Sequence, residues 1–79
     1  MNEIRVESTT LLALAYDGRG MLQLEFCSRA IYHYYGVPPT VYEALLAASS
    51  KGSYFNRVIR GRFPYALWAS AQTGLAGEG

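Results

Sequence analysis

Residues 10–36 decide the fold and read TLLALAYDGRGMLQLEFCSRAIYHYYG. Turn-like sequences at 17–20 (DGRG) and 27–29 (CSR) divide this stretch into three apolar or alternating segments. Alternation of this kind is typical of β-strands, and Asp-Gly pairs favour tight hairpin turns. A shorter alternating segment precedes them at residues 4–7. The pattern therefore predicts an antiparallel β-meander of about four strands with short connections.

The alternation also assigns side chains to the faces of this sheet. The sets expected to share a face are Leu12, Leu14 and Tyr16 in the strand at 10–16, Leu22, Leu24 and Phe26 in the strand at 21–26, and Tyr32 and Tyr34 in the strand at 30–35. The last pair could form an open stacking platform for RNA bases, or belong to a core covered by helices. A domain of this size has little other material to pack, which favours the core. Ile31, His33 and Tyr35 would then face outward, and Ile31 and Tyr35 would form a modest apolar patch suited to a protein partner.

Two helices are expected after the sheet. Proline cannot donate to a β-ladder but suits the first turn of a helix, so the sequence GVPP at 36–39 ends the last strand. One helix should run from about Pro39 to Ala48, and a second from about Lys51 to Arg60. Gly61 can end the second helix in a left-handed conformation. The predicted fold class is therefore α+β, with a small meander packed by two C-terminal α-helices.

The chain has 79 residues, which is enough for one domain. We expect that domain at residues 4–65, followed by a flexible tail at 66–79 that is rich in alanine and glycine, with at most a helical turn near Leu67 and Trp68. The single cysteine, Cys27, allows no internal disulfide and favours a reducing compartment. The sequence has no apolar run near the roughly 20 residues that span a bilayer, and no signal-peptide core. These features predict a cytoplasmic protein.

Several short stretches occur together in a recognisable order. They are Val6-Glu7-Ser8, Ala15-Tyr16-Asp17, the strand residues 22–26, YHYYGVP at 32–38, Val41-Tyr42, ASSKGSYFN at 48–56, Ile59-Arg60 and Pro64-Tyr65. With them the chain resembles the KTSC domain, a family named for its occurrence at the C-terminus of some lysyl-tRNA synthetases. The block SKGSYFN, followed by Ile59-Arg60 and Pro64-Tyr65, is the most specific part, and the similarity covers about residues 4–65.

The resemblance implies a small sheet packed by two helices, in a stand-alone protein of bacterial or phage origin. The family has no well-established activity. Its fusion to an enzyme that handles tRNA implies nucleic-acid binding, although by association only.

Basic residues gather near the end of the expected domain. The segment from Lys51 to Arg62 carries a charge of +4 without an acidic residue, whereas the rest of the chain carries −3. Arginine can fork onto phosphate, and exposed aromatic rings can stack on bases. The pattern predicts a site for RNA, single-stranded DNA or another partner, formed by Lys51, Tyr54, Asn56, Arg57, Arg60, Arg62 and Tyr65. In the alternative interpretation, Phe55 and Ile59 are core, the arginines only solvate a helix face, and Asn56 ties down a neighbouring loop.

A protein-interaction module is the second hypothesis, in the form of a phage-encoded modulator that docks onto a host protein through arginine and tyrosine anchors. The net charge of only +1 favours this second hypothesis, since dedicated nucleic-acid binders are usually more basic. A homodimer through the outer sheet face or an exposed edge strand is a further alternative.

Catalytic residues are scarce in the sequence. The single cysteine and the single histidine, Cys27 and His33, could approach each other across a hairpin, but no motif supplies the orienting group and oxyanion donors that catalysis needs. His33, Glu25 and Asp17 lack the fixed spacing of metal ligands. We therefore expect no enzyme, no cofactor, no metal site and no membrane partner.

Overall fold

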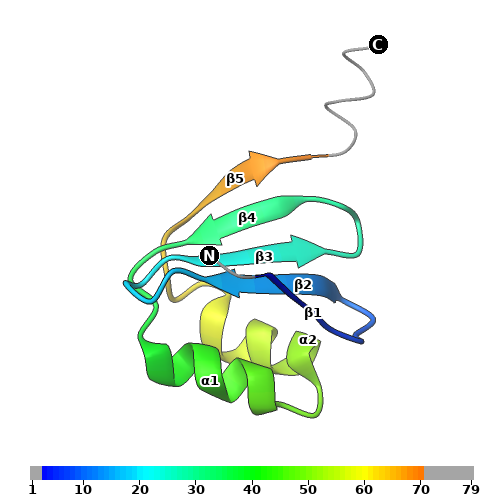
Figure 1. Ribbon diagram of the computed structural model, residues 1–79, viewed down its shortest axis with the longest axis horizontal. Coiled ribbons are helices and arrows are strands. Elements are labelled where there is room, and N and C mark those ends of the chain that lie inside the picture. Colours follow the sequence, from blue (N-terminus) through cyan, green and yellow to red (C-terminus); the bar gives the residue numbers. More distant parts are fainter. Residues whose placement is uncertain (1–2, 71–79) are drawn as a thin grey trace.

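The computed structural model describes residues 3–70, which form one sheet with a helical layer on one of its faces (Figure 1). Five antiparallel strands follow one another in the sheet in sequence order. They are β1 (Glu3–Arg5), β2 (Leu11–Tyr16), β3 (Leu22–Phe26), β4 (Ile31–Tyr34) and β5 (Tyr65–Ala69). The helical layer consists of α1 (Pro39–Ala47), α2 (Lys51–Tyr54) and the π-helical segment η1 (Phe55–Ile59), which continues α2 directly. The predicted α+β class is confirmed, with one strand more than expected.

The β2–β3 turn is fixed by the side chain of Asp17. Its Oδ1 accepts hydrogen bonds from the backbone amides of Arg19 at 2.7 Å and Met21 at 3.0 Å. These two bonds stabilise the carboxylate and hold the pKa of Asp17 below its usual value. The turn predicted from DGRG is thus present, and it sets the register in which Tyr16 lies opposite Leu22.

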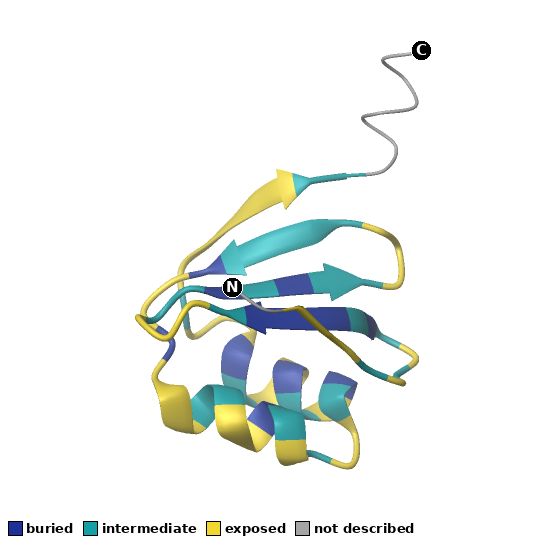
Figure 2. Ribbon diagram, in the orientation of Figure 1, coloured by how far each residue is buried: buried dark blue, intermediate teal, exposed yellow. Residues whose placement is uncertain are grey.

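The helices cover the face that carries Tyr32 and Tyr34. Tyr34 is only 5% exposed, and its ring meets the ring of Phe55 edge-on, with 5.7 Å between centroids. Figure 2 shows the buried residues concentrated where the middle strands meet the helices. The buried cluster consists of Leu11, Leu14, Leu22, Leu24, Tyr34, Val37, Leu45, Phe55 and Ile59. The interpretation of these tyrosines as core residues is confirmed for Tyr34, while Tyr32 is partly buried and packs against the cluster.

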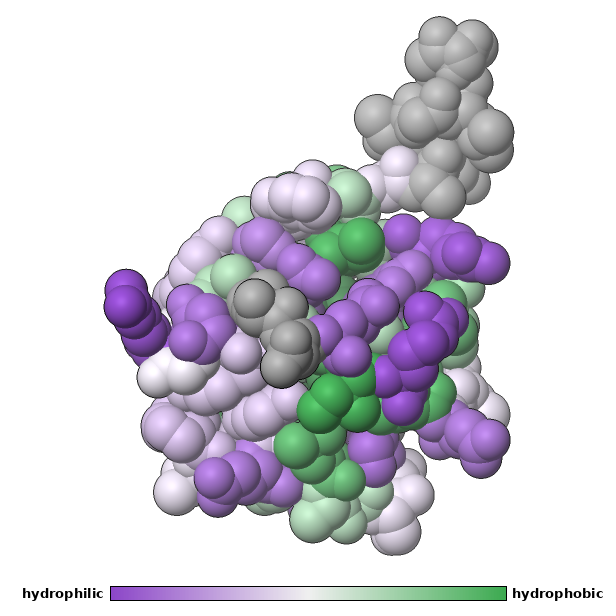
Figure 3. Space-filling view, viewed as in Figure 1, coloured by the Kyte–Doolittle hydropathy of each residue, from purple (hydrophilic) through white to green (hydrophobic). Residues whose placement is uncertain are grey.

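The opposite face of the sheet is mainly polar in the middle strands. Gln23 and His33 lie opposite each other there, and their side chains form a hydrogen bond of 2.8 Å. In the space-filling view, apolar side chains reach the surface in separate areas divided by hydrophilic ones (Figure 3). That side of the molecule therefore presents no single continuous apolar area.

A β-bulge in β2 changes which side chains face the core. The register shifts between Leu11 and Ala13, so that Leu11 lies opposite Phe26 while Leu14 lies opposite Leu24. A bulge places two residues against one on the partner strand and so reverses the alternation on one side of it. Leu11, and not Leu12 as predicted, therefore joins Leu14 on the helix-covered face.

The helix boundaries agree closely with the sequence. Pro39 occupies the first turn of α1, and the Ser50 hydroxyl caps α2 by accepting a hydrogen bond from the Ser53 amide. The second predicted helix, Lys51 to Arg60, differs in its geometry. Its second half is π-helical, and the Arg60 amide donates to the carbonyl of Phe55 at 2.8 Å. The buried residues Phe55 and Ile59 are four residues apart, a spacing that suits an α-helix as well as a π-helix, so the sequence does not distinguish the two.

The prediction for the end of the chain was wrong in part. Residues 65–69 are not frayed or helical but form β5, which pairs with β4 so that Tyr65 lies opposite Tyr34 and Leu67 opposite Tyr32. Gly61, at φ +80°, ends η1 and lets the chain turn back toward this strand. The predicted tail therefore does not begin at residue 66, and its residues 71–79 lie outside the described residues.

Among residues 3–70, none of the helices combines the length and the apolar character that a membrane crossing requires.

Candidate nucleic-acid interface

A groove opens on the helix-covered face, where η1 meets the end of the sheet formed by β4 and β5. Its volume is about 640 Å³. It exists because the helices lie beneath the first strands of the sheet, whereas β5 extends away from them (Figure 1). The residues that line it are Thr10, Phe26, Ser28, Ala30, Tyr32, Tyr34, Phe55, Asn56, Arg60, Gly61 and Tyr65. We call it the aromatic groove.

The wall of the aromatic groove is a chain of ring contacts that ends in an exposed tyrosine. Phe55 meets Tyr34 edge-on, and Tyr34 lies against Tyr65 with 5.5 Å between centroids and a tilt of 32°. Tyr32 supports Tyr65 from the neighbouring position at 5.7 Å. Tyr65 is nevertheless 60% exposed. The groove therefore holds one ring in place from behind and leaves much of its surface free for a planar ligand.

The hydroxyl of Tyr34 stays protonated near neutral pH. Burial, together with the neighbouring hydroxyls of Tyr32 and Tyr65, raises the pKa of Tyr34 to about 12. A protonated hydroxyl can donate as well as accept a hydrogen bond. Tyr34 therefore contributes a polar group to the wall without a negative charge that would repel phosphate.

A guanidinium stands at the rim of the aromatic groove. Arg60 follows η1 directly, and its Nη1 donates to Oδ1 of Asn56 at 3.3 Å, one turn earlier. Both side chains are exposed. Within residues 3–70 the one ion pair joins Arg5 to Glu3, so no carboxylate neutralises Arg60 there. The guanidinium keeps donors available for an anion beside the exposed ring.

A second, polar hollow of about 570 Å³ adjoins the aromatic groove, and Thr10 and Asn56 line both. Its wall is rich in hydroxyl groups and includes two cations and one acid. The lining residues are Glu7, Ser8, Thr9, Thr10, Ser49, Ser50, Lys51, Gly52, Ser53, Asn56 and Arg57. Lys51 Nζ donates to the Ala48 carbonyl at 2.9 Å, which fixes its position. We call this the hydroxyl hollow; its donors suit a phosphate group better than an apolar ligand.

The contact between Gly52 and Thr10 brings the two hollows together. Gly52 is buried, and a Cβ placed on it would lie 2.5 Å from Oγ1 of Thr10. A side chain at this position would push α2 away from the loop before β2. Glycine therefore permits the close approach that puts Thr10 between the aromatic groove and the hydroxyl hollow.

The structure brings most of the predicted site residues together, in two groups. Asn56, Arg60 and Tyr65 lie at the aromatic groove, and Lys51 and Arg57 at the hydroxyl hollow, where Asn56 also belongs. The two remaining residues lie elsewhere. Tyr54 is partly buried against the core, and Arg62 is exposed in the turn after η1 and lines neither space.

Sequence reasoning missed the groove residues that come from the sheet side. Thr10 lies in the loop before β2, Phe26 in β3 and Ser28 in the β3–β4 turn, all far from the basic segment in sequence. Their local patterns indicate only strand and turn. The one signal in the sequence was the resemblance to the KTSC domain. Its matching stretches include Ser8, which lines the hydroxyl hollow, as well as the basic block.

The structure does not bring the cysteine and the histidine into contact. The Sγ of Cys27 lies 3.6 Å from the Ser8 carbonyl, whereas the imidazole of His33 bonds to Gln23 on the outer face. In the part of the chain that the structure describes, no group of three or more His, Cys, Asp or Glu residues is placed to hold a metal ion.

Comparison with known proteins places the chain in a family. The model of the KTSC domain matches residues 7–63. An uncharacterized protein of Stutzerimonas stutzeri is 41% identical over 69 residues, which cover 86% of this chain and 96% of that protein. A lysine–tRNA ligase of Nostoc sp. is 54% identical over 63 residues, 78% of this chain but only 11% of the ligase.

A solved structure has the same fold. The crystal structure of a KTSC domain protein from Yersinia pestis aligns with a TM-score of 0.83 at 32% identity, covering 86% of this chain and 97% of that one. The match of the family model and these similarities agree on one conclusion: the chain belongs to the KTSC domain family.

Proposed function

We propose that this domain is a non-enzymatic binding module that holds single-stranded RNA or DNA across the aromatic groove and the hydroxyl hollow. The observation that carries the proposal is the meeting of the exposed ring of Tyr65 with the guanidinium of Arg60, which no carboxylate among residues 3–70 neutralises, at one groove. Single-strand binders combine these two elements: stacking platforms for bases and cations for the backbone.

Stacking on Tyr65 would supply the contact to the base. Its ring is supported from behind by Tyr34 and Tyr32, so that little side-chain freedom is lost when a base stacks on the open side. A stacked base contributes about 1–3 kcal/mol, and the contact tolerates any base. We therefore expect binding with little sequence preference.

The cations would hold the phosphates on either side of that base. Arg60 serves the aromatic groove, while Lys51 and Arg57 serve the hydroxyl hollow, which the shared residue Asn56 joins to it. Each phosphate contact with a single strand makes the slope of log K against log salt concentration more negative by about 0.7, so three contacts predict a slope of about −2.

The relatives give this proposal associational support. The lysine–tRNA ligase of Nostoc sp. carries a segment like this chain in 11% of its length. A domain that is part of an enzyme named for tRNA lies close to RNA when that enzyme binds its tRNA. This support comes from association with the enzyme and not from the segment itself.

The test compares two arginines that differ in place but not in charge. Binding of mixed-sequence single-stranded RNA and DNA is measured by fluorescence anisotropy over a salt series, for wild type, Arg60→Glu and Arg62→Glu. Both variants change the net charge equally. We expect Arg60→Glu to weaken binding at least about tenfold, and Arg62→Glu, which lines neither space, to weaken it no more than about threefold.

Circular dichroism on each variant shows that it is folded. An equal loss of binding affinity in both variants would mean that only the change in net charge matters. That result would contradict the assigned site. Wild-type protein that binds neither nucleic acid even at low salt would contradict the proposal as a whole.

A protein-interaction module, such as a modulator of a host protein, is the second candidate. It is favoured by the net charge of only +1 and by the exposure of Leu67 and Trp68, at 55% and 64%. Such a complex would have an apolar contact centre and would depend weakly on salt. Binding of a purified partner that survives high salt and is lost in Trp68→Ala would favour this candidate over the first.

A further inference from the structure

The two edge strands of the sheet, β1 and β5, differ in how well they are protected against pairing with a strand from another chain. β1 is three residues long and carries Glu3 and Arg5. β5 is five residues long, reads YALWA and contains no charge and no proline. Natural sheets protect their edges with charges, prolines or very short strands, because an open edge offers unpaired amides and carbonyls to another strand. Among residues 3–70 only β4 pairs with β5, so within this part of the chain the other side of β5 has no partner strand.

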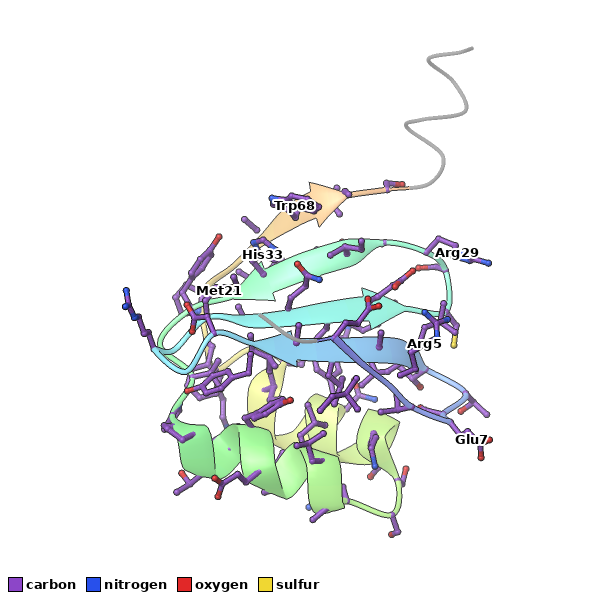
Figure 4. The ribbon with its side chains drawn as sticks, viewed as in Figure 1. Arg5, Glu7, Met21, Arg29, His33 and Trp68 are labelled. Atoms are coloured by element: carbon purple, nitrogen blue, oxygen red, sulfur yellow. The ribbon has the colours of Figure 1, made fainter. Side chains whose placement is uncertain are left out.

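β5 is held firmly in the sheet in spite of its exposure. Trp68 stacks on His33 of β4 on the outer face, with 5.2 Å between ring centroids and 22° between the planes, and Figure 4 shows the two side chains beside each other. Tyr65 is anchored on the other face by Tyr34. The strand is thus anchored on both faces of the sheet, and its outer edge points away from the helical layer (Figure 1).

We propose that β5 pairs antiparallel with β5 of a second copy of this chain, around a two-fold axis at Leu67. In such an isologous contact only the residue on the axis meets its own symmetry mate, so Leu67 lies opposite Leu67 of the second copy, whereas Ala66 lies opposite Trp68. A charged strand would place like charges near each other in this arrangement. An uncharged strand has no such cost, which makes YALWA compatible with itself and makes β1 a poor candidate.

The exposed area indicates a weak, reversible dimer. Leu67 and Trp68 are 55% and 64% exposed. Together they offer roughly 250 Å² per copy, to which the backbone of the paired edge adds. A standard stable interface buries about 800 Å² per partner. We therefore expect association that depends on protein concentration in the micromolar to millimolar range.

The experiment measures molar mass by sedimentation equilibrium on the whole chain, up to about 1 mM protein. Wild type should rise toward twice the monomer mass. Leu67→Lys and Leu67→Glu should each remain monomeric, because each sets two like charges against each other at the two-fold axis. An equimolar mixture of the two variants should associate again, because lysine then lies opposite glutamate.

Ile4→Lys provides the matched control, since it adds the same charge at the other edge, where Ile4 is 40% exposed. It should associate as wild type does. If the wild type stays monomeric at every concentration, the proposal is overturned. The edge of β5 would then be a site for a strand from a different protein. A Leu67→Lys variant that associates as tightly as wild type would also overturn it. Circular dichroism of the monomeric variants excludes unfolding as the cause.

Discussion

Gly52 is the residue on which the geometry of the candidate site depends most directly. A Cβ at this position would lie 2.5 Å from Oγ1 and 2.9 Å from Cβ of Thr10, distances at which one of the two segments must move. Replacing Gly52 with alanine should therefore lower the free energy of unfolding by about 1–3 kcal/mol, the usual cost of overpacking. Urea unfolding followed by circular dichroism measures the change.

Ser53→Ala is the control, because Ser53 is the neighbouring residue and is exposed. It should change stability by no more than about 0.5 kcal/mol. If Gly52→Ala is as stable as wild type, the close approach of α2 to Thr10 is not required by the fold. In that event the glycine of the block SKGSYFN needs another explanation.

The same contact shows why the sequence predicts some site residues and not others. Asn56 lies in η1 and Arg60 directly after it, so a local pattern of basic and aromatic residues is enough to single them out. Thr10 and Ser28 reach the groove only through the packing of the helical layer on the sheet. Nothing local marks a threonine before a strand as part of a site.

Gly61 lies between η1 and β5 and allows the chain to turn from one to the other. It does so through its backbone conformation, whereas Gly52 matters because a neighbouring segment packs close to it. It ends η1 at φ +80°, and a Cβ there would meet nothing within 4 Å. The cost of Gly61→Ala is therefore conformational alone, about 1–2 kcal/mol for a left-handed alanine. Thermal unfolding should show a lower Tm for Gly61→Ala and a smaller decrease for Gly61→Asn, since asparagine tolerates this conformation better. Equal decreases would mean that backbone strain at this position is not the cause of the lower Tm.

The strands differ in how well the sequence predicts them. β2, β3 and β4 are joined by short turns and carry recognisable alternation, so their positions were predictable. β5 was missed because it lies after both helices and pairs with β4 at long range. It is also an edge strand with most of its residues exposed, so burial imposes no alternation on YALWA. Its alanines and the alanine- and glycine-rich sequence that follows favour a tail on composition alone.

The two proposals together determine how the whole molecule would meet a long strand. A two-fold axis perpendicular to the sheet keeps both helical layers on one face, so a dimer through β5 would open both aromatic grooves on that same face. A long oligonucleotide could then occupy two grooves at once, and the second contact would gain from a high effective concentration. An oligonucleotide that fills a single groove could not gain in this way.

Affinity should therefore increase more steeply with length in the dimer than in the monomer. Binding of single strands of about 5 and about 20 nucleotides is compared for wild type and Leu67→Lys. The affinity of both proteins rises with strand length, because a longer strand offers more positions at which one groove can bind. The informative quantity is therefore the increase in affinity for wild type divided by the increase for Leu67→Lys. We expect the gain of wild type to exceed that of Leu67→Lys by at least about tenfold. Equal gains would mean that each groove acts alone, even if the dimer forms, since a dimer whose grooves cannot be bridged has no avidity.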